Sequence, residues 1–471
     1  MVSLETGGRS TAVTTGTGET EVSLRTPMPV SADALFAWHE RPQAFQRLTP
    51  SWMPARVISR EGGIRDGARV SLAVPVGPVS TRWDLEHTGY VAGREFRDVQ
   101  RSGPFASWEH VHTMEPTGEH ASVLEDRIRF RLPAPPFGAM IAGAFTRDRL
   151  ERLLRWRHAL TLADLERHAV FASRGARNIA ITGASGFVGS ALGPFLNTGG
   201  HAVRTIGRGA GSDVSWDPAS RRLDVRALDG VDTMIHLAGA SVAERWTARH
   251  KREILESRVA GTRLVAESCA RMQTRPEVLV CASAIGIYGD RGDTSLDEQS
   301  TLGDDFLAEV VQAWERAAAP AREAGIRVVH MRAGIVLNPS GGALSKMIPA
   351  FQLGAGGRLG SGRQWMSWVS REDLIGAIHH VLQSTGIAGP VNVTAPEPVT
   401  NASFTETLGR ILHRPTLAAV PAFALRTIFG EMAQGTILAS QRVRPAVLAR
   451  SGFQFLHPTL SSALRFELGV L

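Results

Sequence analysis

The chain has 471 residues, which is enough for about three domains of ordinary size. Hydrophobic residues make up 43% and charged residues 21% of the chain, a balance that is typical of globular proteins and excludes a mostly disordered one. The formal net charge is +7, but the basic residues are nearly all Arg and are scattered among acidic ones, which argues against a nucleic-acid-binding protein.

The N-terminal residues and the cysteines indicate the compartment in which the protein is expected. Residues 1–19 are rich in Gly, Thr and Ser, and we expect them to be disordered. They lack the basic and then apolar run of a signal peptide, and no window of the chain approaches the 18 or so apolar residues of a membrane span. The two cysteines, Cys269 and Cys281, have no metal-ligand companions and indicate a reduced protein. We therefore expect a cytoplasmic protein.

Residues 20–170 are predicted to form an α+β domain. Short stretches with strand-like patterning are separated by Gly and Pro turns and followed by a long helix, about Thr146 to His168, whose leucines fall close to one face. The predicted strands are Thr20 to Leu24, Ala55 to Glu61, Arg69 to Val74, Thr81 to Tyr90, Glu95 to Gln100, Ser107 to Glu115 and Ala121 to Phe130. One helix laid across a curved sheet makes a domain with a cleft.

This order of elements resembles the START-like, helix-grip superfamily, with an early helix at about Ser31 to Trp38 and the segment from Phe45 to Trp52 included in the likeness. Members of that superfamily enclose an apolar ligand between sheet and helix, so the resemblance implies a hydrophobic-ligand pocket here. A solid-cored accessory domain is the alternative.

A linker at 171–177 leads into a predicted doubly wound α/β domain at 178–400. Apolar strands alternate there with helical stretches, which is the pattern of a parallel sheet covered on both faces. The predicted strands are Asn178 to Thr182, Ala202 to Ile206, Thr233 to Leu237, Val278 to Ala282, Val328 to Arg332 and Val391 to Thr394. Residues 401–471, with several prolines between helical segments, are expected to form a C-terminal cap that walls one side of the substrate cleft.

The turn after the first of these strands is the strongest functional signal. Gly183, Gly186 and Gly189 follow an apolar strand and open a helix, as in proteins that bind a dinucleotide pyrophosphate. The glycines permit the turn and the close approach of phosphate, and the helix N-terminus offers free N–H groups. We expect cofactor contacts from Gly183, Ser185, Gly186, Phe187, Val188 and Gly189. A tight strand-to-helix turn without a ligand is the alternative.

The end of the second strand favours NADP over NAD. The strand runs into Gly207 and Arg208, and Arg208 stands nineteen positions after Gly189. An acidic residue near this point would bind the ribose hydroxyl of NAD, whereas an Arg accepts the extra phosphate of NADP. No carboxylate stands at that strand end. The alternative is a surface Arg in a loop.

Later strand ends supply the remaining candidates. Leu237, Ala238 and Gly239 are small or apolar and would let a cofactor lie against the backbone. Candidate groups for substrate and phosphate follow at the next two strand ends: Ser283, Tyr288 and Arg332. A strand-end cap, a packed aromatic ring and a turn-stabilising Arg are their respective structural alternatives.

These motifs resemble the extended short-chain dehydrogenase/reductase superfamily, which includes nucleotide-sugar epimerases. The resemblance extends to an atypical epimerase-like family sometimes labelled cell-division inhibitor, through the stretches from Arg245 to Lys251, Ile254 to Arg258, Ala313 to Glu315, Met331 to Leu337 and Gly360 to Trp368. It covers about residues 178–471. It implies a Rossmann fold, a nicotinamide cofactor and a small-molecule substrate.

The superfamily's Tyr-x-x-x-Lys dyad, however, is absent. A phenol has a pKa near 10 and needs a nearby Lys to exchange protons near neutral pH. The chain has two tyrosines, and the residues four positions after them are Arg94 and Gly292. Ser283 keeps a candidate role in orienting a substrate oxygen, and Tyr288 would donate a proton only if another group lowered its pKa.

Three further features of the sequence are a lysine, a glycine-rich stretch and the histidines. Lys251 lies in a charged helical stretch and is predicted to be a solvated surface residue rather than a replacement cation. The glycine-rich stretch from Gly354 to Gly362, followed by Trp365 and Trp368, is interpreted as a mobile loop over the site or a plain surface loop. No histidine, the pair His379 and His380 included, has carboxylates at metal-ligand spacing, so we predict no metal site.

Two functional hypotheses follow. The first is an NADP-binding, epimerase-like oxidoreductase fused to a domain for a hydrophobic ligand. The second is a non-catalytic sensor or regulatory protein that responds to NADP, as the missing dyad suggests. A purely structural fusion is a third. The sequence leaves the substrate and the oligomeric state open.

Overall fold

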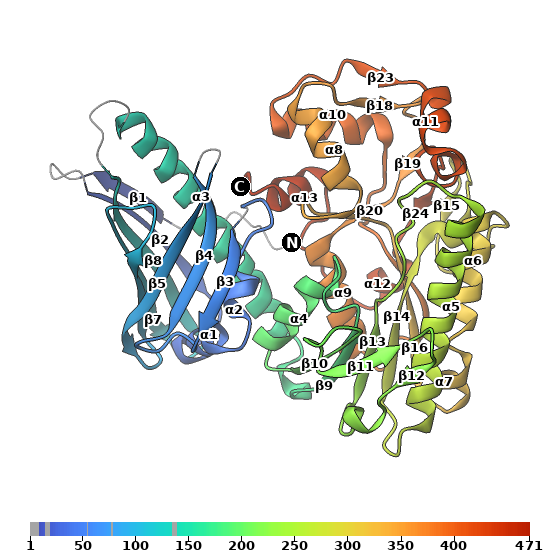
Figure 1. Cartoon of the computed structure of the whole chain (residues 1–471), viewed down its shortest axis with the longest axis horizontal. Coiled ribbons are helices and arrows are strands. Elements are labelled where there is room, and N and C mark those ends of the chain that lie inside the picture. The colour runs from blue at the N-terminus through green and yellow to red at the C-terminus, as the bar shows by residue number, and fades with distance from the viewer. Residues whose placement is uncertain (1–8, 15–18, 54, 77–78, 134–138) are drawn as a thin grey trace. The chain divides into compact units, whose positions relative to one another are not determined.

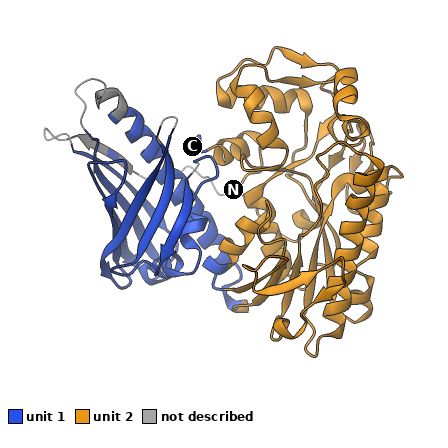
Figure 2. Cartoon of the chain, in the orientation of Figure 1, with its two compact units in different colours: residues 1–173, 197–200, 469–471 blue, residues 174–196, 201–468 orange. Residues whose placement is uncertain are grey.

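The computed structural model describes residues 9–14, 19–53, 55–76, 79–133 and 139–471 (Figure 1). The chain divides into two compact units (Figure 2). Unit 1 comprises residues 1–173, 197–200 and 469–471, and unit 2 comprises residues 174–196 and 201–468. Each unit has its own sheet.

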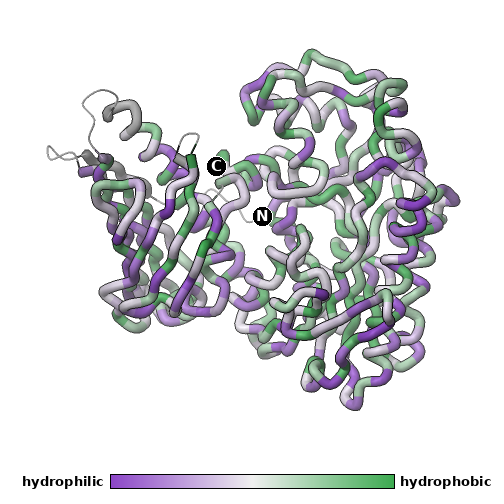
Figure 3. Tube along the Cα trace, in the orientation of Figure 1, coloured by the Kyte–Doolittle hydropathy of each residue, from purple (hydrophilic) through white to green (hydrophobic). Residues whose placement is uncertain are grey.

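Unit 1 is an antiparallel sheet of eight strands in the order β1-β2-β8-β7-β6-β5-β4-β3. Figure 3 shows hydrophilic and hydrophobic residues mixed along its strands, and in β8 every second side chain is buried. The strands are β1 (Arg9–Thr14), β2 (Thr20–Met28), β3 (Arg56–Glu61), β4 (Arg69–Val76), β5 (Val79–Val91), β6 (Glu95–Ser102), β7 (Ser107–Gly118) and β8 (Ala121–Arg131). The helices are α1 (Ala32–Glu40), α2 (Ala44–Arg47) and α3 (Ala139–Ala169).

The long helix α3 covers one face of this sheet. Leu150 and Leu154 of α3 are buried in one cluster with Leu24, Leu72 and Phe130 from the strands. The predicted helix and its apolar face are therefore confirmed, although α3 begins seven residues earlier than expected at Ala139. Ser31 caps α1 by accepting a hydrogen bond from the Ala34 N–H. The helix-grip arrangement predicted from the sequence is confirmed.

The prediction that residues 1–19 are disordered is wrong for one stretch. Residues 9–14 form β1, which pairs with β2 from Arg9 opposite Arg25 to Thr14 opposite Thr20. The backbone of the edge strand β2 supplies hydrogen bonds that residues 9–14 satisfy, and a composition rich in Thr does not oppose a strand. Residues 1–8 and 15–18 lie outside the described residues.

Unit 2 is built on a second sheet in the order β12-β11-β10-β9-β13-β14-β16-β21, parallel except for the pair β11 and β12. The strand order reverses beside β9, so the carboxyl ends of β9 and β13 mark a topological switch point. Its strands are β9 (Asn178–Thr182), β10 (Ala202–Gly207), β11 (Val214–Asp217), β12 (Arg222–Leu223), β13 (Thr233–His236), β14 (Val278–Ala284), β16 (Arg327–Ala333) and β21 (Gly389–Val393). The doubly wound α/β fold is confirmed.

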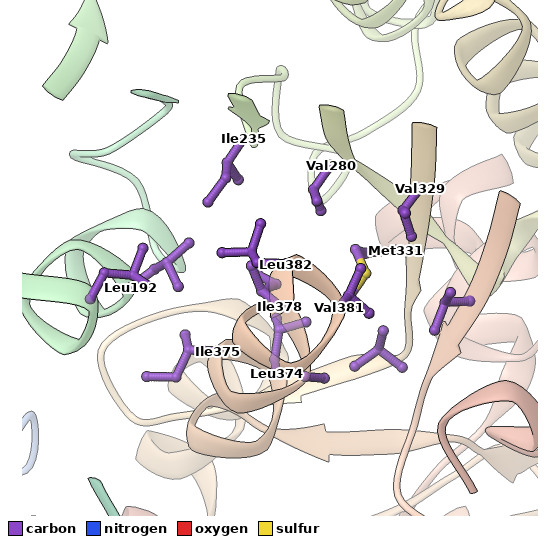
Figure 4. Packing of buried hydrophobic residues seen from close by; sticks show 14 of the residues in the cluster. Leu192, Ile235, Val280, Val329, Met331, Leu374, Ile375, Ile378, Val381 and Leu382 are labelled. Carbon is purple, nitrogen blue, oxygen red and sulfur yellow. The ribbon is translucent and has the colours of Figure 1, made fainter. Parts of the chain in front are cut away.

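Helices cover both faces of this sheet. They are α4 (Gly189–Thr198), α5 (Ala248–Arg271), α6 (Phe306–Arg316), α7 (Ala319–Glu323), α8 (Gly342–Gln352) and α9 (Arg371–Gln383). On one face, Ile378 and Leu382 of α9 lie toward Ile235, Val280 and Val329 of the strands (Figure 4). The opposite face carries a second cluster that includes Ala180, Met234, Leu279, Leu264 and Cys269. Because both faces are covered, the strands are continuously apolar.

The rest of unit 2 consists of four short α-helices after residue 400 and of short paired strands between residues 295 and 443. The helices are α10 (Asn401–Leu412), α11 (Ala422–Phe429), α12 (Ala446–Arg450) and α13 (Leu460–Glu467). The strands are β15 (Ser295–Leu296), β17 (Ile335–Leu337), β18 (Gly357–Leu359), β19 (Trp365–Met366), β20 (Trp368–Ser370), β22 (Val399–Thr400), β23 (Ala418–Val420) and β24 (Arg442–Val443). None of the helices in the described part of the chain is long and apolar enough to cross a membrane.

The glycine-rich stretch from Gly354 to Gly362 differs from a loose loop. Its centre is β18, which pairs with β23, and Trp368 in β20 is fully buried. A Cβ on Gly357 would lie 2.0 Å from the Ala418 carbonyl oxygen, so the glycine is needed for this pairing. The interpretation as a mobile loop missed the backbone partner, which lies about 60 residues further along the chain.

Candidate functional site

The glycine turn has the geometry of a dinucleotide-binding turn. Gly183 has a φ of +70°, and a Cβ there would lie 2.9 Å from the Ala238 backbone nitrogen. A Cβ on Gly189 would lie 2.2 Å from the Gly183 carbonyl oxygen, which already accepts a hydrogen bond from the Gly186 N–H at 2.9 Å. Only glycine fits at both positions, and α4 starts directly from the turn. The turn therefore leaves the space beside the α4 N-terminus that a pyrophosphate requires.

The other residues of the turn divide into exposed and packed positions. Ser185 and Gly186 are exposed, whereas Phe187 and Val188 are half-buried. The Phe187 ring packs against Gly341, where a Cβ would lie 2.5 Å from the ring. Val188 packs on the core beneath the sheet. The exposed residues are thus free for a ligand, and the packed ones hold the turn in place.

The carboxyl end of β13 lies directly beside this turn. The Leu237 N–H donates to the Thr182 carbonyl oxygen at 3.2 Å, and the hydroxyl of Thr182 lies 2.7 Å from His236 Nδ1. Leu237 and Ala238 are half-buried, and Gly239 is exposed. The structure therefore brings Gly183, Ala238 and Gly239 together, as the sequence predicted.

The end of β10 forms the next part of the site. β10 pairs with β9, so Arg208 leaves the sheet on the strand next to the glycine turn. Arg208 is exposed, and no hydrogen bond or ion pair connects it to the residues that the structure describes. Gly207 packs against Ser212, where a Cβ would lie 2.2 Å from the hydroxyl oxygen. The guanidinium of Arg208 is therefore available to an anionic ligand.

Arg258 is a candidate that the sequence analysis did not identify. It lies in α5, and its side chain lies 3.5 Å from the place of a Cβ on Gly239. Its guanidinium stacks 4.9 Å from the ring centre of Trp314 and donates a hydrogen bond to the Ile254 carbonyl oxygen at 3.2 Å. Burial lowers the pKa of Arg258 to about 10. A half-buried cation beside the cofactor turn suits a phosphate or ribose oxygen.

Ser283 and Arg332 meet at a carboxylate that was also not predicted. The Glu315 carboxylate, on α6, accepts hydrogen bonds from the Ser283 hydroxyl at 2.7 Å and from Arg332 Nε and Nη2 at 2.8 and 2.9 Å. β14 and β16 are neighbours with Ser283 opposite Arg332, which explains the meeting. Glu315 stands 32 residues after Ser283, so spacing gave no signal for it.

Tyr288 belongs to the same network and is fully buried. Its hydroxyl donates to Asn392 Oδ1 at 2.7 Å and accepts from Arg332 Nη1 at 3.0 Å. Its ring packs in a cluster with Ile285, Ile287 and Val443. We call Ser283, Glu315, Arg332, Tyr288 and Asn392 the Glu315 network. In it every guanidinium nitrogen of Arg332 has a partner.

The electrostatics of the Glu315 network favour a charged Glu315 carboxylate and a neutral Tyr288 phenol. Burial alone would raise the pKa of Glu315, but hydrogen bonds from Arg332 and Ser283 hold it below its ordinary value. For Tyr288 burial prevails, and its pKa is raised despite the neighbouring Arg332. A phenol with a raised pKa does not exchange protons readily at neutral pH. The geometry therefore favours a packing role for Tyr288 over the predicted role as a proton donor. All three guanidinium nitrogens of Arg332 are bonded to Glu315 or Tyr288.

Two further features of unit 2 are the position of Lys251, which the sequence analysis considered, and a second cavity. Lys251 pairs with Glu431 at 2.7 Å and lies 4.2 Å from the ring centre of Phe306, away from the glycine turn in sequence and in contact with none of its residues. A shallow cavity lies over the loop after β14 and is lined by Tyr288, Asp290, Arg291 and Asp305, among others. Its acidic lining does not suit a phosphate.

The cavity in unit 1 is small, and its lining contains both apolar and titratable residues. It encloses about 60 Å³, whereas pockets for drug-sized ligands take about 300–1,000 Å³. Phe96, Ile64 and Leu48 line part of it, but charged and titratable side chains line the rest: His39, Arg60, His87, Asp98, His112 and Arg157. The β-strand pattern predicted a sheet and a helix correctly, but it did not reveal that histidines and aspartates lie among the apolar residues of the inner face.

Comparison with known families accounts for both units. Residues 179–393 match the NAD dependent epimerase/dehydratase family, and residues 28–155 match the family described as polyketide cyclase / dehydrase and lipid transport. Residues 420–467 match a domain of unknown function, DUF1731.

Individual relatives extend these matches. An epimerase family protein of Mycobacterium bovis is 42% identical over 292 residues, which cover 61% of this chain and 96% of the relative. The solved structure of a nucleoside-diphosphate sugar epimerase from Corynebacterium glutamicum is 33% identical, with a TM-score of 0.78, and covers 95% of this chain and 90% of that one. The human epimerase family protein SDR39U1, solved with NADPH, is 32% identical, with a TM-score of 0.58, over 62% of this chain and 100% of that one.

Proposed function

The chain belongs to the epimerase family, and from that premise we propose that unit 2 binds NADP(H) at the glycine turn and acts as an epimerase-like oxidoreductase on a small-molecule substrate. The observation that carries the choice of NADP is Arg208. It is exposed, it has no partner among the described residues, and it stands at the carboxyl end of the strand beside the turn. The human relative was solved with NADPH, which supports the same choice.

Each part of the proposed cofactor site has a distinct task. The turn from Gly183 to Gly189 holds the pyrophosphate through its backbone, and Arg208 binds the ribose 2′-phosphate through a charge-assisted pair. Arg258 adds a second positive charge beside Gly239. A bound nicotinamide supplies hydride transfer. The protein's own contribution is to orient the reacting groups.

Ser283 and Tyr288 have different tasks in this proposal. Because the Ser283 proton lies on the bond to Glu315, the Ser283 oxygen offers an acceptor to a substrate hydroxyl. Tyr288 uses its proton on Asn392 and its lone pair on Arg332, so we propose that it positions Arg332 and does not exchange protons.

Replacing Arg208 tests the cofactor proposal. In Arg208→Glu, we expect NADPH affinity to fall about 10- to 100-fold, because the new carboxylate repels the 2′-phosphate, while NADH affinity stays within about twofold. Arg226→Glu is the matched control, since Arg226 is also exposed but lies before β13 at its amino end. Titration calorimetry on the full chain measures both affinities. Equal losses for the two cofactors would contradict the role of Arg208.

A non-catalytic NADP-dependent sensor is the second candidate. The observation that favours it is that the hydroxyls of Ser283 and Tyr288 are both engaged inside the protein. A sensor binds NADPH tightly but shows no hydride transfer with any carbonyl or alcohol tested. Turnover that disappears in Ser283→Ala, with NADPH affinity unchanged, would exclude the sensor and support the enzyme.

For unit 1 we propose a small ligand that carries a polar group. The mixed lining around Phe96, with Arg157 and His112 on one side, suits such a ligand better than a hydrocarbon chain. Native mass spectrometry of the full chain, followed by extraction and identification of what is bound, tests this. Recovery of a purely apolar lipid would contradict it.

A further inference from the structure

Three strands of unit 1 bring histidines and carboxylates together on the inner face of the sheet. His110 and His112 are two residues apart in β7, so both point to the same side. Asp98 of β6 stands opposite His110, and Asp126 of β8 stands opposite His112. We call Asp98, His110, His112 and Asp126 the Asp98 cluster. Helix α3 closes over it, since His158 Nε2 of α3 lies 3.1 Å from Asp126 Oδ2.

The spacing inside the cluster is that of metal ligands. Asp98 Oδ1 lies 3.5 Å from His110 Nδ1 and 3.8 Å from His112 Nε2, which is too long for good hydrogen bonds. In a tetrahedral site with bonds of about 2.1 Å, neighbouring ligand atoms are about 3.4 Å apart. Asp98, His110 and His112 each offer an atom within 4.8 Å of the others, and among the described residues no other group of three meets that condition.

The atoms that face away from this centre are also arranged as around a metal. His112 Nδ1 lies 2.6 Å from Asp126 Oδ1, the usual carboxylate partner for the outer nitrogen of a metal-bound imidazole. Trp108 Nε1 donates to Asp98 Oδ2 at 3.0 Å, which leaves Oδ1 for the centre. Asp126 Oδ2 is held by His158, whose Nδ1 in turn lies 2.8 Å from the Thr26 hydroxyl oxygen.

The protein alone does not satisfy this cluster. On the side of the rings that faces Asp126, His110 is only 3% exposed, yet its Nε2 lies 3.7 Å from Asp126 Oδ1 and has no hydrogen-bond partner, and His112 Nδ1 and Asp126 Oδ1 are close without hydrogen-bond alignment. Buried polar atoms are almost always paired, so unpaired ones need an explanation. The carboxylates of Asp98 and Asp126 lie on either side of the His112 ring and draw positive charge to this place.

One side of the centre is open. Asp98 and His112 also line the cavity of unit 1, beside Phe96 and Arg157. Three protein ligands with an accessible fourth position are typical of metal sites that bind water or a substrate, whereas structural sites are closed. The cavity thus provides both the entry path and the room for a small ligand.

We propose that Asp98, His110 and His112 bind a divalent transition-metal ion, Zn²⁺ or Fe²⁺, whose open coordination position faces the cavity of unit 1. Two imidazoles and one carboxylate suit these ions and do not suit Mg²⁺ or Ca²⁺, which prefer oxygen ligands. The prediction of no metal site relied on spacing along the chain. It missed this group because strand register, and not sequence proximity, joins β6 to β7.

Metal loading of the full chain tests the proposal. The chain is purified with a tag that lacks histidine, treated with EDTA, and loaded with Zn²⁺, Fe²⁺ under anaerobic conditions, or Co²⁺ as a spectroscopic probe. We expect about one ion per chain after desalting and a Co²⁺ d–d spectrum of a four- or five-coordinate site. Less than a tenth of an equivalent with all three ions would overturn the proposal, and so would a six-coordinate Co²⁺ spectrum.

Variants separate the proposed site from surface binding. His110→Asn and His112→Asn should each weaken metal affinity at least tenfold, whereas His120→Asn, an exposed histidine on the turn between β7 and β8, should leave it unchanged. Equal affinity in all variants means an adventitious ion only and overturns the proposal. If the two inner variants do not fold, X-ray absorption of the Zn²⁺-loaded wild type decides: scattering from two imidazoles supports the site, and a shell of oxygen atoms alone contradicts it.

Discussion

The Glu315 network in unit 2 and the Asp98 cluster in unit 1 both bury charged side chains, but they treat them differently. In the network, Arg332 uses all three of its guanidinium nitrogens on Glu315 and Tyr288. In the cluster, His110 Nδ1 and His112 Nε2 lie 3.5 and 3.8 Å from Asp98 Oδ1, too far for good hydrogen bonds, and the ring nitrogens and the carboxylate oxygen on the Asp126 side have no aligned partner. A satisfied buried network stabilises one arrangement of the chain, whereas an unsatisfied one indicates a missing ligand. The two regions therefore separate a structural role from a binding role.

Removing the charge of Glu315 should give the largest effect. Glu315→Gln leaves the Arg332 cation, which is 4% exposed, without its counter-ion, and we expect the free energy of unfolding of unit 2 to fall by about 3–5 kcal/mol. Hydrogen exchange of the β14 and β16 amides measures it, with unit 1 as the internal reference. Glu309→Gln, an exposed change on the same helix, is the control and should have almost no effect. A loss below about 1 kcal/mol would mean that the network is not satisfied in the way described.

A buried histidine in unit 2, His236, makes the stability of that unit depend on pH, and this gives a second test of the comparison. Burial lowers the pKa of His236 from 6.5 to about 4, and no carboxylate partners it. Below pH 6.5 the unfolded chain takes up a proton on this residue, but the folded chain does so only near pH 4. The contribution of neutral His236 to the free energy of unfolding is therefore fully present above pH 6.5. It is lost as the pH falls, and the loss reaches about 3 kcal/mol at pH 4.

The variant His236→Asn isolates this contribution. It should flatten the pH dependence of unit 2 between pH 6.5 and 4, as followed by hydrogen exchange of the β9 and β13 amides after correction for intrinsic rates. An unchanged slope would mean that another group causes the loss.

Replacing the buried tyrosine should have the smallest effect. Tyr288→Phe removes one donor and one acceptor but no charge, so we expect unit 2 to lose about 1–2 kcal/mol of stability while NADPH affinity stays within about twofold. Tyr90→Phe is the matched control, because the Tyr90 hydroxyl bonds to Glu40 at an exposed position. Calorimetry and hydrogen exchange measure the two quantities. Loss of NADPH binding in Tyr288→Phe alone would place the tyrosine in the cofactor site.

Features that depend on neighbouring residues could be predicted from the sequence, whereas features that depend on a partner far along the chain could not. The strand before Gly183 and the helix after the turn depend on neighbouring residues: the predicted strand Asn178 to Thr182 has the bounds of β9, and a helix follows as expected. The edge strand β1 depends on a partner strand, and β18 depends on one 60 residues away, so composition misjudged both. Arg208 could be proposed from the sequence because its distance from the turn is a local property.

The networks could not be predicted for the same reason. Glu315 reaches Ser283 only after α6 has packed against β14, and Asp98 reaches His110 only through strand register. An Arg in the middle of a charged helix, such as Arg258, carries no signal of its own until Trp314 and Gly239 lie beside it.

Anomalous diffraction from crystals of the full chain loaded with Zn²⁺, collected at the zinc absorption edge, tests the contrast between the two regions most directly. We predict a peak between Asp98, His110 and His112, and no peak at the Glu315 network or at His330 beside it. A peak at the network with none at the cluster, or no peak in either region, would contradict the account.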